Sequence, residues 1–355
     1  MTSSPRDPMR VLAWPAHRSR NPYPGLVVAS VERAAAAAGR RVEYGEFRPL
    51  TAWTASADVV HLHWPELAVS SPSRLRAALK SAAVRLGLWG LRRRGARIVW
   101  TRHNTSSHEG HHPDLERRLR SSVERQVAGV IDLHDDDRPP PSDARRAVIR
   151  HGDYGAVVGR ADRAEARRAL GVRDGDVVLA ALGSIRPYKQ IPELVGAVRH
   201  AAATDGRIRL VVAGRPSDDS LADAVRRRAD GSDAVTLRLG WVDDAEMDGL
   251  VAAADVVVLP YRRLENSGVL LLGLTGGRPV AATEGPAVAD ALDVVGPDWV
   301  LPIGDIDAST IGEVVAWAGA ARTGSPDLSA YAWDEIGRRT LALYDAVIDG
   351  GSTGS

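Results

Sequence analysis

The fold is decided by the stretch Val177-Val178-Leu179-Ala180-Ala181-Leu182-Gly183-Ser184-Ile185-Arg186-Pro187-Tyr188-Lys189. It begins with six apolar residues, a length typical of a strand buried on both faces of a sheet. Gly183 ends this run, and the helical segment Ile191–Ala203 follows the loop. A buried strand, a loop containing glycine and a helix, in this order, predict one unit of a parallel sheet.

The same alternation continues in both directions along the chain. We expect strands at Arg10–Trp14, Val42–Phe47, Val59–His63, Ile98–Arg102, Val130–Leu133, Val148–Ile149, Val177–Leu182, Ile208–Ala213, Val235–Leu239, Val256–Leu259, Val280–Ala282 and Trp299–Leu301. Expected helices include Leu26–Ala38, Pro113–Val127, Ile191–Ala203, Ser220–Ala229, Ala245–Ala253 and Ser267–Thr275. The pattern predicts the α/β class, with two doubly wound domains in tandem. Ligands bind such sheets at the carboxyl ends of the strands, so we also expect an interdomain cleft.

The length of the chain indicates where the domains divide. Its 355 residues exceed what a single core usually supports. The glycine-bearing segment His151–Gly155 follows the last expected strand of the first half. We therefore assign residues 1–152 to an N-terminal domain and 153–330 to a C-terminal domain. Residues 350–355 are small and polar, and we expect them to form a disordered tail.

The composition excludes several classes of protein. The formal net charge is +1, which gives no support to a nucleic-acid-binding role. The chain has no cysteine, so disulfides and thiolate catalysis are excluded. No run of about 18 apolar residues and no apolar signal segment are present, which predicts a cytoplasmic enzyme.

The loop after the strand Val177–Leu182 carries the first candidate site. Gly183 lets the backbone turn tightly and approach a ligand. Arg186 offers a planar fork of hydrogen-bond donors, and Lys189 offers a mobile point charge. Two cations at a strand-to-helix turn are suited to a diphosphate. The alternative is an ordinary loop with two solvated cations.

The turn Glu265-Asn266-Ser267-Gly268-Val269 carries the second candidate site. Ser267 or Asn266 can cap the helix that follows. The backbone N–H groups of Ser267, Gly268 and Val269 would then point toward an anion. Glu265 could accept hydrogen bonds from sugar hydroxyl groups, or it could simply be a favourable charge near a helix start.

The order of these motifs resembles the donor-binding domain of GT-B glycosyltransferases, and most closely that of the family 4-like enzymes. The order is strand, Gly-x-x-Arg-x-x-Lys, helix, then strand, Pro-Tyr, Glu-Asn-Ser-Gly, helix, Gly-x-Pro-Val and strand. Matching pieces of the first half are Asn21-Pro22-Tyr23, His61-Leu62-His63-Trp64-Pro65-Glu66 and Thr101-Arg102-His103-Asn104. The fold implied is two Rossmann-like domains, with residues 331–349 as a terminal helix that crosses back to the first domain.

The resemblance also implies roles for individual residues. Arg186 and Lys189 would bind the donor diphosphate. Glu265 would lie near the transferred sugar, where it is both a donor-binding and a catalytic candidate. The remaining donor-binding candidates are loop and helix-start residues, namely Gly183, Gly214, Asn266, Ser267, Gly268 and Val269. The acceptor-side candidates are Asn21, Tyr23 and Asn104.

One departure from the family pattern concerns the nucleotide ribose. Family 4 enzymes usually carry a second glutamate eight positions after the first, which binds the ribose. Here that spacing leads to Gly273, and counting back from Gly277-x-Pro279 leads to Leu272. Neither is acidic, so ribose recognition has to come from other residues, and the stereochemical outcome stays open.

Three residues of the first half are candidates for the catalytic base. His61 and His63 alternate on one strand and face the same side of the sheet. We interpret His61 as a hydrogen-bonded core residue, because His63 and Glu66 lie closer to the strand end. His103 ends another strand. Each of His63, Glu66 and His103 could accept a proton from an acceptor hydroxyl.

Two polar tracts could suggest a metal site. His103, His108, His111 and His112 lie within ten positions, and Asp135-Asp136-Asp137 is an acidic run. Neither has the spacing of a helical His-Glu-x-x-His motif. GT-B transfer does not generally need a metal, so we expect neither a metal nor a cofactor.

Residues 74–94 form a cationic helical segment. Leu75, Leu79, Ala82, Leu86 and Trp89 recur at helical spacing. The first interpretation is an amphipathic helix packed on the sheet. The alternative is a peripheral contact with the inner face of a membrane, where a lipid-linked acceptor would lie.

The function expected from these features is metal-independent transfer of a sugar, a hexose in the first instance, from a nucleoside-diphosphate sugar to an acceptor hydroxyl. A sugar, a lipid-linked sugar or a small molecule could be the acceptor. The alternatives are a sugar-nucleotide epimerase of the GT-B type and a non-catalytic nucleotide-sugar-binding protein. The residues do not specify the donor base, the sugar or the oligomeric state.

Overall fold

The computed structural model describes residues 8–15, 21–103, 112–135, 138–141, 143–262 and 264–350. Contacts within the chain divide it into two compact units. One unit comprises Met1–Gly152 together with Tyr331–Ser355, and the other comprises Asp153–Ala330. The predicted tail lies outside the described residues except for Gly350.

The first unit is built on a parallel sheet of six strands. The strands are β1 (Met9–Trp14), β2 (Val42–Glu46), β3 (Val59–Leu62), β4 (Arg97–Arg102), β5 (Val127–Asp132) and β6 (Arg145–Val148). Their order across the sheet is β2-β1-β3-β4-β5-β6, and every pairing is parallel. Successive strand residues point to opposite faces, so β3 and β4 each supply apolar side chains to two separate cores.

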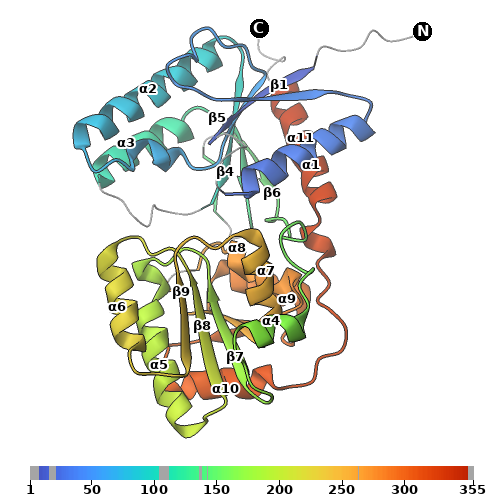
Figure 1. The fold of residues 1–355 in the computed structure, drawn as a ribbon. Helices are drawn as coiled ribbons and strands as arrows, with labels where there is room; N and C mark the ends of the chain where they lie inside the picture. The colour runs from blue at the N-terminus through green and yellow to red at the C-terminus, as the bar shows by residue number, and fades with distance from the viewer. Residues whose placement is uncertain are drawn as a thin grey trace. The chain divides into compact units, whose positions relative to one another are not determined.

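Helices cover both faces of this sheet (Figure 1). On one face lie α2 (Arg74–Arg93) and α3 (Pro113–Glu124), joined to β3 through the short 3₁₀ helix η1 (Pro65–Val69). On the other face α1 (Tyr23–Ala37) and α11 (Trp333–Asp349) lie side by side, the blue and red helices of Figure 1. The last helix of the chain is therefore part of the core of the first unit.

The second unit contains another parallel sheet of six strands. The strands are β7 (Val177–Leu182), β8 (Ile208–Gly214), β9 (Val235–Leu239), β10 (Val256–Leu259), β11 (Val280–Thr283) and β12 (Val300–Ile303). Their order is β12-β11-β10-β7-β8-β9, again parallel throughout. The α/β doubly wound class predicted from the alternation is confirmed in both units.

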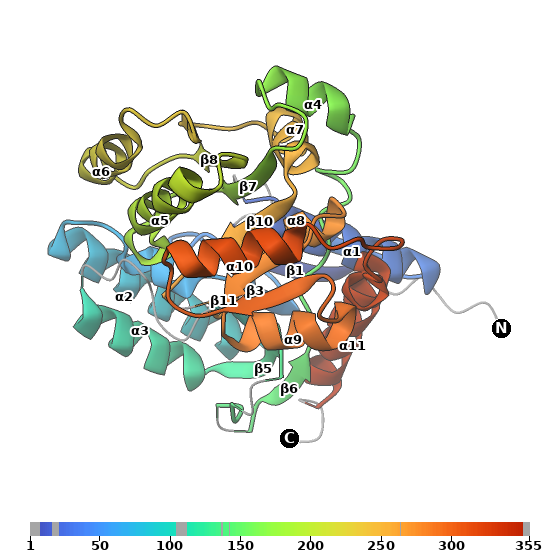
Figure 2. The ribbon, with the colours of Figure 1, turned by 90° about the horizontal axis from the view of Figure 1, so that it is seen from below.

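The helices of the second unit also occupy both faces of its sheet. One face is covered by α5 (Ile191–Thr204), α6 (Asp219–Ala229) and α10 (Ala308–Ala318), of which α5 and α10 lie side by side (Figure 2). The other face packs against α7 (Asp244–Ala253) and α8 (Gly268–Thr275). The short helix α4 (Arg163–Ala169) contacts α7, and α9 (Pro286–Val295) contacts β12.

Each sheet has one point where the order of its strands reverses direction. In the first unit the chain moves outward from β1 to β2 and then returns to β3, so the reversal lies between β1 and β3. In the second unit it lies between β7 and β10. Ligands of open α/β sheets bind at the carboxyl ends of the strands beside such a point.

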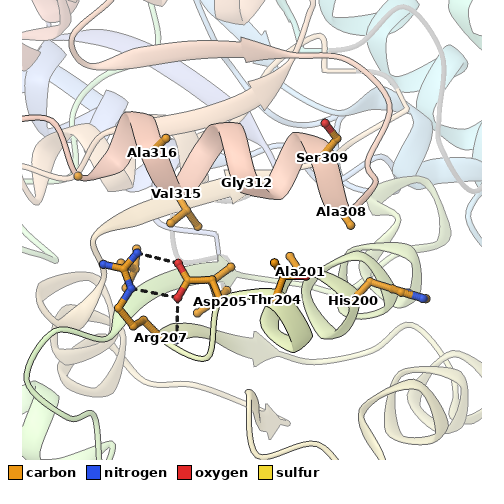
Figure 3. A pocket seen from close by; sticks show the side chains of 13 residues that line it. His200, Ala201, Thr204, Asp205, Arg207, Ala308, Ser309, Gly312, Val315 and Ala316 are labelled. Atoms are coloured by element: carbon orange, nitrogen blue, oxygen red, sulfur yellow. Dashed lines mark hydrogen bonds and ion pairs between the residues drawn. The ribbon is translucent and has the colours of Figure 1, made fainter.

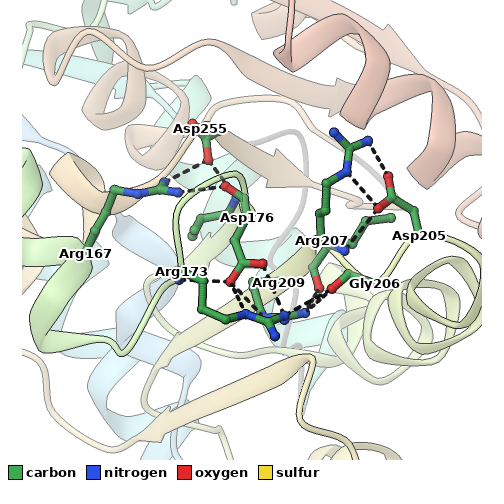
Figure 4. Close-up of polar contacts among 10 residues, drawn as sticks. Arg167, Arg173, Asp176, Asp205, Gly206, Arg207, Arg209 and Asp255 are labelled. Carbon is green, nitrogen blue, oxygen red and sulfur yellow. Dashed lines mark hydrogen bonds and ion pairs between the residues drawn. The ribbon is translucent and has the colours of Figure 1, made fainter.

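Two carboxylates, the buried Asp176 and the half-buried Asp255, form ion pairs and hydrogen bonds at the opposite, amino-terminal edge of the second sheet (Figure 4). Asp255 accepts hydrogen bonds from the Val178 amide at 2.7 Å and from Arg167 at 3.0 Å. Asp176 pairs with Arg173 and Arg209. Because these groups satisfy one another, we interpret this edge as structural.

Helix α2 packs on the sheet through a different set of residues from the one expected. Its buried residues are Ala77, Ser81, Val84, Gly87, Leu88, Gly90 and Leu91. Four of the five residues of the predicted stripe, Leu75, Leu79, Leu86 and Trp89, are exposed instead. The small residues allow the helix to approach the sheet closely, whereas the large apolar residues face outward. No helix among the described residues is both long and apolar enough to cross a membrane.

Candidate functional site

The two candidate loops of the second unit lie next to each other at its reversal point. One follows β7 and contains the 3₁₀ helix η2 (Pro187–Lys189), and the other follows β10. The Gln190 side-chain amide donates a hydrogen bond to the Pro260 carbonyl at 2.8 Å. The backbone N–H of Arg262 donates to the Tyr188 carbonyl, also at 2.8 Å. Two segments separated by more than sixty residues are thereby fixed into one surface.

Lys189 is a buried cation at the centre of this surface. Its side chain is 6% exposed, and its Nζ lies 4.8 Å from the centre of the Tyr261 ring. No ion pair to Lys189 is found among the described residues. Desolvation lowers the pKa of the ammonium group, and the nearby Arg186 guanidinium lowers it further. A bound anion would relieve both effects, so this position favours a negatively charged ligand.

Glycines bring the backbone close to the lysine. Gly183 has a φ of +85°, and a Cβ atom there would lie 3.1 Å from the Val269 side chain and 4.0 Å from the Lys189 Nζ. Gly214, at the end of β8, has a φ of +150°, and a Cβ there would collide with the Gly183 carbonyl oxygen. Side chains other than hydrogen would therefore separate the neighbouring strand ends.

Helix α8 begins beside the same surface. Ser267 is its N-cap, and the Ser267 hydroxyl accepts a hydrogen bond from the Leu270 amide at 3.2 Å. A cap by Ser267 or Asn266 was predicted, and the structure assigns it to Ser267. The first amides of the helix have no acceptor within the helix and carry partial positive charge, which adds to the charge of Lys189. Glu265 and Asn266 are half-buried just before the cap.

Tyr154 is a neighbour of this helix start that the sequence did not reveal. Its hydroxyl group lies where a Cβ of Gly268 would be, and burial raises its pKa to about 12. The Tyr154 amide donates to the Thr275 hydroxyl at 3.1 Å. The tyrosine belongs to the glycine-bearing segment that served only as a domain boundary in the sequence.

The position of the missing second glutamate is part of the core. A Cβ at Gly273 would lie 3.0 Å from both the Val257 and the Val280 side chains, and Leu272 is 6% exposed. A carboxylate at either place would be buried among apolar side chains. The departure from the family pattern therefore has a structural basis.

In the first unit, a cluster of imidazole and aromatic rings occupies the strand ends near the reversal point. Its closest ring pairs are His61 with His63 at 4.2 Å, Trp64 with His103 at 4.3 Å and Tyr23 with His151 at 4.4 Å between centroids. Trp333 joins from the start of α11, 6.0 Å from Tyr23. His151 and Trp333 were not predicted. The position of His151 just after a strand was the signal that could have identified it.

His61 is a structural member of this ring cluster, as expected. One ring nitrogen is 2.7 Å from the Tyr344 hydroxyl, and the other is 2.7 Å from the Thr101 hydroxyl. Burial lowers the pKa of His61 to about 3. With both nitrogens in use, His61 is not available to a substrate.

His63 and His103 lie together, with ring centroids 5.7 Å apart. Both are buried, and burial together with the surrounding histidines lowers their pKa values well below the usual range. They are therefore neutral. The His63 Nδ1 has no hydrogen-bond partner among the described residues.

Glu66 has a different environment from the two histidines. It is a half-buried residue of η1, immediately after the ring cluster. Desolvation raises its pKa to about 7, and the charge of Glu116 contributes in the same direction, whereas Arg120 opposes it. A carboxylate that changes protonation near neutral pH and retains some exposure has the properties of a general base.

The acceptor-side candidates give a mixed result. The Asn21 side chain accepts a hydrogen bond from the Tyr23 amide at 3.0 Å, which makes a local turn. Tyr23 is buried inside the ring cluster. Asn104, His108, His111, Asp136 and Asp137 lie outside the described residues. Within the described part of the chain, no group of three or more histidine, aspartate or glutamate side chains has an arrangement that could hold a metal ion.

A cavity of about 580 Å³ lies elsewhere in the second unit, between the end of α5 and α10 (Figure 3). It includes Val177 and Ile208, which are the first residues of β7 and β8. It is therefore at the amino ends of the strands, opposite to Lys189. An Asp205–Arg207 ion pair of 2.7 Å lies at its rim.

Comparisons with known proteins agree with this arrangement. A family profile described as "Glycosyl transferases group 1" matches residues 176–314, which include both candidate loops. A GDP-mannose:glycolipid 4-beta-D-mannosyltransferase of Xanthomonas campestris pv. campestris is 32% identical over 291 residues, covering 81% of this chain and 79% of the relative. The chain belongs to the group 1 glycosyltransferases. It is a GT-B enzyme of the family 4 type, as the motif order predicted.

Solved structures agree with the fold of this glycosyltransferase. Sucrose-phosphate synthase from Thermosynechococcus elongatus superposes with a TM-score of 0.64 at 15% identity, over 97% of each chain. Anabaena HepE in complex with UDP-glucose superposes with a TM-score of 0.61 at 14% identity, over 97% of this chain and 100% of the other. The protein is thus a transferase, and by its relatives a hexosyltransferase.

Proposed function

We propose that this glycosyltransferase moves a hexose, with mannose as the leading candidate, from a GDP-sugar to a hydroxyl group of a lipid-linked saccharide. The name of the Xanthomonas relative supports this choice of donor and acceptor. That relative aligns over most of both chains, whereas the UDP-binding neighbours share only the fold.

The observation that carries the donor assignment is the buried Lys189 beside the close pair of glycines, with no ion-pair partner in the described part of the chain. Lys189 and Arg186 would hold the diphosphate, and the first amides of α8 would add hydrogen bonds. As the bond between sugar and phosphate breaks, negative charge grows on the leaving diphosphate. Preorganised cations and amides at that position stabilise the transition state, which would make a bound metal unnecessary.

The stereochemical part of the proposal is inversion. The mannosyl bond of GDP-mannose is α, so a β-mannoside forms from it with inversion at the anomeric carbon. The acceptor oxygen attacks that carbon, the bond to the diphosphate breaks, and GDP leaves. The acceptor hydroxyl loses its proton in this step. We assign Glu66 as the base that accepts it, because among Glu66, His63 and His103 it combines partial exposure with a pKa near neutrality.

His63 and His103 are assigned to the architecture around the base. Both rings are buried and neutral in the ring cluster, and Trp64 of this cluster lies two residues before Glu66 in the sequence. They would limit the water around the carboxylate and so maintain its raised pKa. Glu265, close to the α8 cap, is assigned to the hydroxyl groups of the transferred sugar.

The location proposed for the enzyme follows from its acceptor. A lipid-linked saccharide is held at a membrane, and nucleotide sugars are made in the cytoplasm. We therefore place the protein in the cytoplasm at the inner face of the membrane, with residues 74–94 as the contact segment.

Donor binding tests the proposal directly. Titration with GDP, UDP and dTDP should give the greatest thermal stabilisation with GDP, since stabilisation increases with ligand concentration over Kd. Lys189→Ala should remove about 2–4 kcal/mol of transition-state stabilisation, which lowers kcat/KM roughly 30- to 1000-fold. Arg262→Ala is the matched control, because this exposed cation lies in the adjoining loop and pairs with Glu193. Normal GDP affinity and turnover in the Lys189 variant would refute the diphosphate assignment.

A further inference from the structure

Helix α2 presents an apolar stripe to solvent. The exposed fractions are 70% for Leu75, 63% for Leu79, 54% for Leu86 and 44% for Trp89. Their spacing puts them on one side of a helix of 20 residues, which is about 30 Å long. The opposite side of α2 is anchored in the core, so the stripe is not available to the first unit's own interior. Large apolar side chains gathered in this way mark an interaction surface.

A tryptophan from another segment extends the stripe. Trp53 is 50% exposed, and its ring centroid is 6.2 Å from that of Trp89 in an edge-to-face arrangement. Arg94 donates to the carbonyl oxygens of Ala52 and Ala55, which fixes the Trp53 turn against the end of α2. The paired rings are thus held outward by the structure. Tryptophan is enriched at membrane interfaces, where its ring is partly apolar and partly polar.

The charge of α2 has a single sign. Its 20 residues include no aspartate or glutamate, and six are cationic: Arg74, Arg76, Lys80, Arg85, Arg92 and Arg93. Within the described residues, only Arg74 of these six forms an ion pair, with Asp114 at 2.7 Å. Arg93 lies 4.9 Å from the Trp89 ring centre. The Lys80 ammonium group donates a hydrogen bond to the Leu67 carbonyl oxygen at 3.1 Å. The other cations, which no carboxylate of the described chain neutralises, border the apolar stripe.

We propose that Trp53, Leu75, Leu79, Leu86 and Trp89, with the bordering cations, form a docking surface for an anionic lipid bilayer. Apolar side chains would enter the acyl boundary, and the cations would contact anionic headgroups. A second copy of this chain fits less well, because a symmetric contact would set cations against cations. The surface deepens the proposed function, since it would hold the enzyme where a lipid-linked acceptor is embedded.

Vesicle binding of the full-length protein tests the surface. We expect cosedimentation with vesicles of phosphatidylcholine and phosphatidylglycerol and little binding to phosphatidylcholine alone. A triple variant, with Arg76→Gln, Lys80→Gln and Arg85→Gln, should bind the anionic vesicles on the order of a hundredfold more weakly. Each cation near an anionic membrane contributes about 1 kcal/mol of binding free energy, and each 1.4 kcal/mol corresponds to about a tenfold change in affinity. Leu79→Ser with Leu86→Ser should weaken it on the order of tenfold.

A control with the same change in net charge is available on α6. Arg226→Gln, Arg227→Gln and Arg228→Gln combined remove three exposed cations from the second unit and should leave vesicle binding unchanged. An equal loss in this control would mean that net charge alone drives binding and would overturn the proposal. Equal binding to both vesicle types, or a dimer in light scattering that Leu79→Ser and Leu86→Ser dissociate, would also overturn it.

GDP titration of the same variants separates the two proposals. Normal thermal stabilisation by GDP in an α2 variant that no longer binds vesicles would support the docking surface. Vesicle binding that survives in the α2 variants would refute the docking surface, whatever the donor results show. If GDP stabilises neither the parent protein nor the variants, the proposed donor is refuted. That result does not affect the docking surface, which the vesicle-binding measurements alone decide.

Discussion

The reversal points of the two sheets have similar topology and opposite chemistry. At the one between β7 and β10, a buried ammonium group lies among glycines and the start of a helix. At the one between β1 and β3, neutral imidazoles pack against tyrosine and tryptophan, and a carboxyl group with a raised pKa follows. The first environment suits an anion, and the second suits a neutral hydroxyl group that has to lose a proton. The same fold thus supplies the position, and the side chains decide the chemistry.

Histidine content makes this contrast measurable. Nine of the ten histidines lie within the first 152 residues, and His200 is the exception. Four of the nine belong to the ring cluster and have lowered pKa values: His61, His63 and His103, which are buried, and His151, which is half-buried. Acid should therefore act on the two units unequally.

The largest expected effect is acid unfolding of the first unit. The unfolded histidines bind protons below about pH 6.5, whereas burial lowers the pKa of His61 to about 3 and that of His151 to about 4. The unfolded state therefore binds more protons as the pH falls, and stability decreases. Each histidine removes up to about 1.4 kcal/mol per pH unit, so His61 and His151 together remove up to about 3 kcal/mol per pH unit near pH 5. His63 and His103, whose pKa values burial also lowers, act in the same direction.

Hydrogen exchange measured separately in the two units checks this expectation. Amides of β3 and β4 should lose protection at a higher pH than those of β7 and β8. Simultaneous loss of protection in both units would contradict the contrast. A His200→Gln variant is the control, because this exposed residue belongs to the second unit and not to the ring cluster, and its acid transition should match that of the parent.

Replacement of the proposed base gives the next largest effect. Glu66→Gln should lower kcat/KM roughly 10²- to 10⁴-fold, the usual contribution of general base catalysis. The base acts in its deprotonated form, so the parent activity should rise with pH through about 7 and then level off. The Gln variant should lack this inflection. A parent profile that is flat between pH 6 and 8 would exclude Glu66 as the base.

Glu116 offers a matched control for the pH profile. Its negative charge helps to raise the pKa of Glu66. Glu116→Gln should therefore shift the inflection to lower pH while activity at high pH is retained. An inflection that stays in place would show that another group controls the profile.

The smallest expected effect tests the cap of α8. Ser267→Ala removes the hydrogen bond to the Leu270 amide and should cost about 1 kcal/mol of stability, with a Tm decrease of about 2–4 °C. Ser267→Thr preserves the hydroxyl and should behave like the parent. If the cap also orients amides toward the diphosphate, GDP affinity should fall in the Ala variant alone. A Tm that is the same in the parent protein and in both variants would contradict the capping role.

The sequence was most informative where one periodicity dominated. The strands Val177–Leu182, Val235–Leu239 and Val256–Leu259 have the predicted bounds. The first and the last are short, largely buried apolar runs, whereas Val235–Leu239 is a half-exposed edge strand in which apolar and polar residues alternate. Helices α9 and α10 were not predicted, since they are short, rich in alanine and valine, and resemble strands in composition. Helix α2 was predicted, but its buried face was not, because glycine, alanine and serine pack closely on the sheet while leucine faces solvent.

The candidate site could be predicted in part for the same kind of reason. Lys189 and Ser267 were found because local order alone places them at strand-to-helix turns. The absence of an ion pair at Lys189 within the described residues, and the pKa of Glu66, depend on neighbours distant in sequence. The contact of Tyr154 with Gly268 and that of His151 with Tyr23 join segments more than a hundred residues apart, so no local pattern could reveal them.

The return of α11 to the first unit has a consequence for the order of folding. Ile336, Leu341, Leu343, Tyr344 and Val347 complete one face of the first sheet, and Tyr344 holds His61. Residues 153–330 are continuous in the chain, so every strand and helix of the second unit is available once residue 330 has left the ribosome. The first unit, although synthesised earlier, lacks a wall of its core until the chain has passed through the second. During synthesis the apolar face of the first unit would stay exposed until α11 is made. We therefore expect chaperones to bind mainly to residues 1–152 of the nascent chain.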